Sequence, residues 1–158
     1  MTIAETNISD LLRSVQFLDE LSPGDLAKIA EIAAIENLAK STVLFQEGTA
    51  CESLYVVADG MIGLDMCMPR RGCMRMLTVG PGEIVGWSAL LADARMTARA
   101  VVVEDVILIA FPARQLQELC DADHDIGYVV MKQVAMAMSR RLLATRLQQL
   151  DLFIETSS

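Results

Sequence analysis

Residues 80–105 read G-P-G-E-I-V-G-W-S-A-L-L-A-D-A-R-M-T-A-R-A-V-V-V-E-D. Glycines bound a short extended segment at the start, and an apolar turn follows at residues 88–91. A polar loop then leads into the β-branched run at residues 100–103. Glycines that separate short apolar runs are typical of turns between strands. The stretch therefore predicts a strand, a one-turn helix, a loop and a second strand, in that order.

This order resembles the phosphate cassette of cyclic-nucleotide-binding domains, which runs approximately F-G-E-x-x-L, a short loop, then R-[ST]-A. Val85-Gly86 matches F-G, and Thr97-Ala98 matches [ST]-A. The resemblance implies that backbone N–H groups at the helix start and the arginine hold a cyclic phosphate, since a helix N-terminus presents unpaired donors and partial positive charge. It also implies that the glutamate accepts a hydrogen bond from the ribose. The candidate ligand-binding residues are Gly86, Trp87, Ser88, Ala89, Arg95, Met96, Thr97 and Ala98.

Two charged positions of the cassette differ in this chain. Trp87 stands where the glutamate belongs, and Met96 stands where the arginine belongs. An indole only donates hydrogen bonds, so it cannot accept from a sugar hydroxyl, and a thioether offers a phosphate no counter-charge. Arg95 lies one position early, in a loop where a small backbone change can aim its side chain inward. Within a strand the same shift would turn it to the other face.

Several interpretations of these residues stay open. Trp87 either fills the core and closes the sugar site or forms a stacking platform for an aromatic ligand. Arg95 is either a solvated surface charge or a phosphate ligand. Three functions follow: a sensor of a small anionic or nucleotide-like ligand, a ligand-free interaction module, or cyclic-AMP binding through Arg95. The third is expected least, because each lost charge-assisted contact costs about 1.5–3 kcal/mol.

Length and charge limit the remaining function classes. A chain of 158 residues is expected to form one domain, and its net charge of −8 argues against direct nucleic-acid binding and against an anionic membrane surface. No signal peptide or membrane span is evident, so we expect a cytoplasmic protein. The catalytic motifs of hydrolases, zinc peptidases and P-loop enzymes are missing from the sequence, which indicates a non-catalytic protein. The cysteines show no C-x-x-C pairing, so no metal or other cofactor is expected.

The expected fold is mostly β, an antiparallel β-roll with flanking helices. We expect N-terminal helices at residues 1–36, with one helix over residues 8–18, and the roll at residues 37–111 with the cassette-like segment at 82–98. C-terminal helices follow at 112–155. Asp59-Gly60 predicts a hairpin turn between strands at 53–58 and 61–68, and two further strands are expected at 98–103 and 106–111. Cys67 and Cys73 flank M-P-R-R-G, a spacing that allows them to face each other across a hairpin, and they are expected to be free thiols in a reducing compartment.

The last helix, at about residues 125–154, is longer than one domain core requires. One apolar stripe is expected to cover the roll: Ile126, Val130, Val134, Ala137 and Leu142. A second stripe with spacings of three and four is typical of a coiled coil and predicts a homodimer seam: Met131, Ala135, Met138, Leu142 and Thr145. In bacterial regulators of the resembled family such a helix leads into a DNA-reading domain. Here the sequence ends at Ser158, so we expect no DNA contact and propose a partner protein instead.

Overall fold

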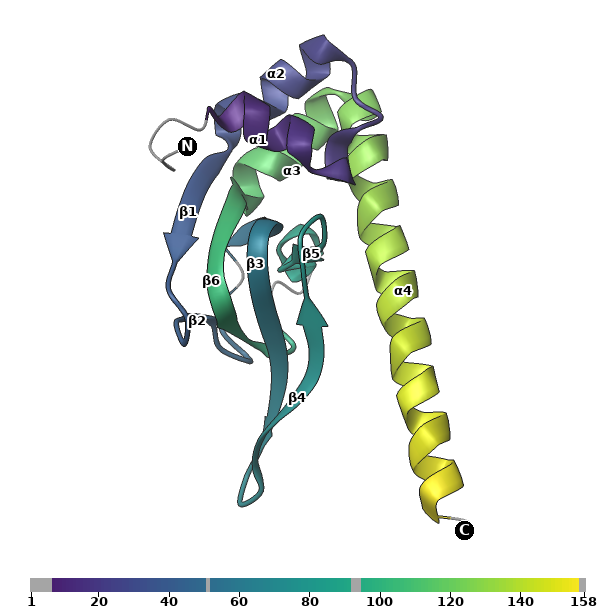
Figure 1. The fold of residues 1–158 in the computed structure, drawn as a ribbon. Coiled ribbons are helices and arrows are strands. Elements are labelled where there is room, and N and C mark those ends of the chain that lie inside the picture. Colours follow the sequence, from purple (N-terminus) through teal and green to yellow (C-terminus); the bar gives the residue numbers. More distant parts are fainter. Residues whose placement is uncertain (1–6, 51, 92–94, 157–158) are drawn as a thin grey trace.

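The structure is a computed structural model and describes residues 7–50, 52–91 and 95–156. In this part of the chain, an antiparallel sheet of six strands curls into a roll, with short helices at one end and a long C-terminal helix alongside (Figure 1). The strands are β1 (Ala34–Leu38), β2 (Val43–Phe45), β3 (Ser53–Met68), β4 (Gly72–Val79), β5 (Ile84–Val85) and β6 (Arg99–Pro112). The helices are α1 (Ile8–Ser14), η2 (Gln16–Leu18), α2 (Pro23–Ile32), η3 (Trp87–Leu90), α3 (Ala113–Ala122) and α4 (His124–Thr156). The predicted fold class is confirmed.

Two long strands, β3 and β6, form the centre of the sheet and pair from Ser53↔Pro112 to Asp65↔Arg99. The predicted hairpin at Asp59-Gly60 is wrong, because β3 continues through these residues and the register shifts there instead. Gly60 has φ of 88°, and a Cβ at this position would lie 2.2 Å from the carbonyl oxygen of Asp105. The glycine therefore allows a bulge where two backbones approach closely. The two strands expected at 98–103 and 106–111 are likewise one strand, β6.

The hydrophobic core has two main parts. One lies between the sheet and the helices and includes Ile29, Leu54, Phe111, Leu116 and Ile126. The other lies inside the roll and includes Val57, Ile62, Val85, Val102 and Leu108. Each such side chain contributes about 1.5–3 kcal/mol when fully buried. Packing on both faces of the sheet explains why β3 and β6 are rich in apolar residues on both sides.

The N-terminal segment is less helical than predicted. The Asn7 side chain caps α1 by accepting from the Ser9 amide at 3.2 Å, but Val15 is extended and ends the helix, so residues 8–18 are not one helix. The break lets η2 turn Phe17 and Leu18 into the core. β1 begins at Ala34, within the range expected to be helical, because its residues pair with β6.

The tip of the β3–β4 hairpin carries a disulfide. Cys67 and Cys73 face each other in the strand register and are bonded, so the expectation of free thiols is wrong. The physical reason is their directly opposite position on two paired strands, which brings their side chains together. The disulfide therefore closes the end of this hairpin.

The buried apolar residues of helix α4 all lie in its first half. Ile126, Val130 and Val134 are buried there, and Ala137 is half-buried. Leu142 is 53% exposed, so its predicted role in covering the roll is wrong. Gln148 donates to the Met76 carbonyl at 3.1 Å, which keeps the later turns beside β4 (Figure 1). None of the described helices combines the length and the apolar character that a bilayer crossing requires.

Candidate functional site

The cassette-like segment begins at a tight turn after β5. β5 pairs with β3 through Tyr55↔Val85, and Gly86 then adopts φ of 83° before η3 starts at Trp87. A Cβ at Gly86 would lie 2.7 Å from the Ser53 carbonyl oxygen, so a side chain here would strain the turn and meet the neighbouring backbone. The glycine thus positions η3 against the roll, as the sequence predicts.

The second half of the segment returns against the loop after β2. Met96 donates its amide to the Thr49 carbonyl at 3.0 Å and accepts from the Gly48 amide at 2.8 Å. The guanidinium of Arg95 donates to the Gly48 carbonyl at 2.9 Å. The intervening residues 92–94 of the expected segment 82–98 lie outside the described residues. The Arg95 side chain therefore links the second half of the cassette-like segment to the loop after β2.

Between the two halves lies a cavity of about 40 Å³. It brings together six of the eight predicted ligand residues: Gly86, Trp87, Ser88, Met96, Thr97 and Ala98. The cavity is also lined by Phe45, Leu64, Val85 and Arg141. Arg95 does not belong to the lining, and neither does Ala89, which is buried against Met96. The sequence thus predicts most of the residues that line the cavity, but it does not predict the positively charged residue among them.

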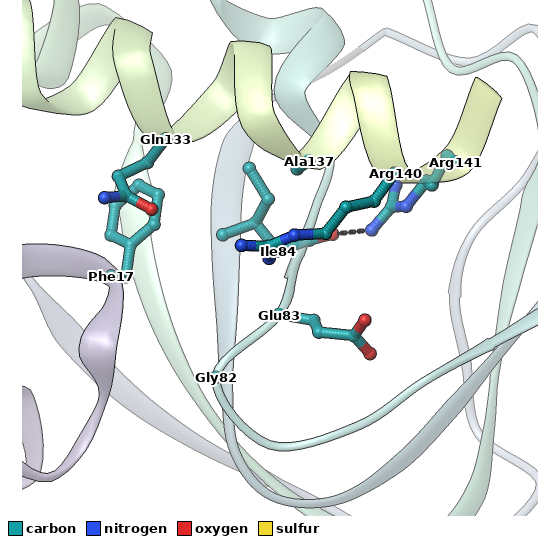
Figure 2. Close-up of a pocket in the computed structure, with 8 residues that line it drawn as sticks. All are labelled: Phe17, Gly82, Glu83, Ile84, Gln133, Ala137, Arg140 and Arg141. Atoms are coloured by element: carbon teal, nitrogen blue, oxygen red, sulfur yellow. Dashed lines mark hydrogen bonds between the residues drawn. The ribbon is translucent and has the colours of Figure 1, made fainter. Parts of the chain in front are cut away.

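That cation is Arg141, which reaches the cassette from α4. Its guanidinium carbon lies 4.1 Å from the centroid of the Trp87 ring. It also donates a hydrogen bond to the carbonyl oxygen of Ile84 (Figure 2). Burial lowers the pKa of Arg141 to about 10, although the carboxylate of Glu83 acts in the opposite direction. Arg141 therefore stays charged at neutral pH and links α4 to the cassette.

A sequence signal for Arg141 exists. Residues 126, 130, 134, 137 and 141 follow spacings of four, four, three and four along one face of a helix. The first four are apolar and pack on the roll, so a charged residue at the fifth position points toward the domain rather than toward solvent. A pattern of apolar residues alone places Leu142 in that stripe instead of Arg141, so it does not identify the arginine.

Another arginine near the cassette is bound to a carboxylate. Asp65, whose side chain is 5% exposed, accepts from Arg75 Nε at 2.7 Å and from Arg99 at 3.1 Å. These hydrogen bonds hold the pKa of Asp65 below its usual value, and the bond from Arg75 has the larger effect. Arg99 is thus engaged by Asp65 rather than turned to the cavity.

One cluster of carboxylates outside the cassette has the spacing of metal ligands. Oxygen atoms of Asp25, Asp123 and Asp125 lie within 4.8 Å of one another. Lys28 donates to Asp123 at 2.9 Å and lies 3.8 Å from Asp25, so a protein ammonium group already supplies positive charge there. These contacts join α2 to the start of α4.

The family model of the cyclic nucleotide-binding domain matches residues 35–123, which include the sheet and the cassette. The chain belongs to the cyclic nucleotide-binding domain family. A solved structure from Geobacter metallireducens, described as a cyclic nucleotide-binding protein, has a TM-score of 0.74 and 26% identity over 83% of this chain and 95% of that one. The catabolite activator protein of Thermus thermophilus has a TM-score of 0.69 and 26% identity, covering 87% of this chain and 62% of that one.

Similarity extends to parts of much longer proteins. The cGMP-dependent protein kinase, isozyme 1, of Drosophila melanogaster is 30% identical over 101 residues, which are 61% of this chain and 13% of the kinase. The chain spans between 8% and 32% of the length of the curated relatives it matches. These matches support a cyclic nucleotide-binding-type regulatory domain and do not extend to the activity of a whole relative.

Proposed function

We propose that this domain is a non-catalytic regulatory sensor whose altered cassette does not bind cyclic AMP tightly. The observation that carries the proposal is the small size of the cavity at the cassette, about 40 Å³, which Trp87, Met96 and Arg141 help to line. Pockets for drug-sized ligands in proteins measure about 300–1,000 Å³. A cyclic nucleotide would have to displace at least one of these side chains before it could enter.

The contact between Arg141 and the cassette supports a sensor role. Arg141 belongs to α4, while Trp87 and Ile84 belong to the segment that would meet a ligand. A ligand that displaces the guanidinium would bind more tightly when α4 has moved away from the cassette than when Arg141 contacts Trp87. Binding would therefore shift the position of α4. The exposed second half of α4 would transmit that shift to a second copy or to a partner protein.

Calorimetry with cyclic AMP and cyclic GMP tests the proposal. We expect no micromolar binding by the wild type, because the cassette lacks both charged ligands of the family. The double variant Trp87→Glu/Met96→Arg restores them and is expected to gain binding by at least tenfold. Each charge-assisted contact contributes about 1.5–3 kcal/mol, equivalent to a factor of roughly ten or more.

The controls separate the alternatives. Micromolar binding by the wild type would contradict the proposal. If Arg95→Ala then abolished that binding, the nucleotide would be held through a shifted Arg95, which would first have to release the Gly48 carbonyl. Absence of binding in the double variant would show that residues besides Trp87 and Met96 close the pocket.

A second candidate is a ligand-free dimeric interaction module. The observation in its favour is the exposure of the predicted seam, where Met131 is 44%, Met138 41% and Leu142 53% exposed. Such apolar surface on one helix is typical of an interface. A module of this kind would be dimeric in nucleotide-free buffer and would show no change in assembly with any small ligand, whereas a sensor would respond to its ligand.

A further inference from the structure

We propose that the altered cassette binds a small oxyanion, the size of a carboxylate or an inorganic anion, between the guanidinium of Arg141 and the hydroxyl of Ser88. This inference rests on the proposed function, because it names the ligand class of the same site. In this arrangement the cation comes from α4 instead of from the cassette loop. The ligand would therefore contact both elements that a sensor must couple.

The first support is the state of Arg141. Its guanidinium is largely buried, stacks on Trp87 and donates to the Ile84 carbonyl. Within the described chain, no carboxylate oxygen lies within 4.0 Å of it, whereas Arg75 and Arg99 share Asp65 at such distances. Burial disfavours this charge and lowers the pKa of Arg141 to about 10, and the more distant carboxylate of Glu83 offsets only part of that effect. An anion at this position would supply a closer counter-charge.

The second support is independent and comes from Ser88. This residue is 8% exposed and lines the same cavity. Its hydroxyl makes no hydrogen bond with any residue of the described chain, and the oxygen is not among the fully buried polar atoms, so it is available to a ligand. Thr97, an exposed residue, lines the cavity as well. Two hydroxyl donors and one guanidinium around one space are complementary to an oxyanion.

The size and walls of the cavity define the ligand class. A cavity needs about 10–15 Å³ to hold one water molecule, so this one of about 40 Å³ takes a group of a few atoms. Phe45, Leu64 and Val85 form apolar walls, and a low-dielectric surrounding strengthens the attraction between an anion and Arg141. A carboxylate or a small inorganic oxyanion fits these conditions, and a whole nucleotide does not.

Trp87 is the only tryptophan of the chain, so its fluorescence reports on this site directly. The wild type is titrated with acetate and with inorganic phosphate at constant ionic strength, which is held with sodium chloride. We expect a saturable change in Trp87 fluorescence. Preference for acetate would identify a carboxylate ligand, and preference for phosphate would identify an inorganic oxyanion.

The variants test the two named groups. Arg141→Gln is expected to weaken binding at least tenfold, and Ser88→Ala, a smaller change that leaves the helix contact in place, several-fold. Arg140→Gln is the matched control, because Arg140 is exposed and does not line the cavity at the cassette, although it shares a neighbouring cavity with Arg141 and Glu83 (Figure 2). Its anion affinity should equal that of the wild type.

Three outcomes would overturn the inference. They are a change that does not saturate, equal responses in wild type and Ser88→Ala, or an equal loss in Arg140→Gln and Arg141→Gln. Each of these leaves the proposed function in place, because that depends on the cyclic-nucleotide titrations. Conversely, tight cyclic-AMP binding rejects the proposed function, while a saturable acetate response that depends on Ser88 and Arg141 still supports the anion site.

Discussion

Asp65 is a buried carboxylate of β3 that binds arginines from both neighbouring strands. It is 4% exposed and lies between Arg75 of β4 and Arg99 of β6. The Nε atom of Arg99 is buried and has no hydrogen-bond partner among the described residues. The carboxylate is thus the group that holds two guanidinium groups, from two strands, in place.

We expect Asp65→Asn to lower the free energy of unfolding by about 2–3 kcal/mol at pH 7. This is less than for a fully buried ion pair, since solvent reaches Arg75. The folded pKa of Asp65 lies below its ordinary value near 3.9. Its contribution is therefore present above that value and is lost as the pH falls through the folded pKa.

Urea unfolding of wild type and Asp65→Asn between pH 7 and pH 3 measures this effect, and the difference between them should shrink below about pH 4. Asp10→Asn is the control, because that carboxylate is 68% exposed and its pair with Arg13 spans 3.8 Å. A difference that stays constant down to pH 3, or a control as destabilised as Asp65→Asn, would contradict the role given to Asp65.

At the same scale, sequence reasoning finds residues that match a local pattern and misses those defined by distant contacts. Gly86 and Thr97 follow from the cassette pattern, and both line the cavity. The pair of Arg141 and Trp87 spans the β-roll and the last helix, so no local pattern predicts it. The disulfide between Cys67 and Cys73 depends on strand register and on redox conditions, and the sequence directly reports only their spacing along the chain.

The elements of the fold are predicted best where one local preference acts alone. Ser22 caps α2 by accepting from the Asp25 amide at 3.2 Å, and a serine followed by a proline is typical of a helix start. Asp59-Gly60 has the composition of a hairpin turn, yet it lies within β3. Tertiary pairing with β6 outweighs the local turn preference there, because the two long strands form backbone hydrogen bonds on both sides of the bulge.

The bulge in β3 gives a prediction about this pairing. Gly60→Ala should destabilise the domain by more than about 1 kcal/mol, since φ of 88° strains a side chain and its Cβ would meet the Asp105 carbonyl. Gly24→Ala is the control, because nothing lies within 4 Å of a Cβ there and the residue is helical. It should be neutral or slightly stabilising. Thermal unfolding measures the stability of both variants. Equal stability losses in the two would contradict the role given to Gly60.

At the scale of the whole molecule, the second half of α4 carries apolar side chains that the roll does not cover. The predicted seam of Met131, Ala135, Met138, Leu142 and Thr145 is exposed at every position. The structure also exposes a second apolar stripe, with spacings of seven, four, three and four: Met136, Leu143, Leu147, Leu150 and Ile154. Both stripes have coiled-coil spacing. Both stripes can be read from the sequence, but only the exposed fractions show that the roll leaves the second stripe uncovered.

The proposed homodimer can be tested stripe by stripe. A glutamate in the centre of a helical interface places a charge in apolar surroundings, so Leu142→Glu should weaken dimerisation at least a hundredfold, equivalent to about 2.7 kcal/mol or more. Leu147→Glu carries the same change on the other stripe and should leave the dimer intact. Sedimentation equilibrium over a range of concentrations measures the dimer dissociation constants of both variants, and thermal unfolding confirms that each variant is folded.

If only Leu147→Glu dissociates the dimer, the seam lies on the second stripe and the predicted residues are wrong. A wild type that is monomeric at all concentrations would reject the dimer itself.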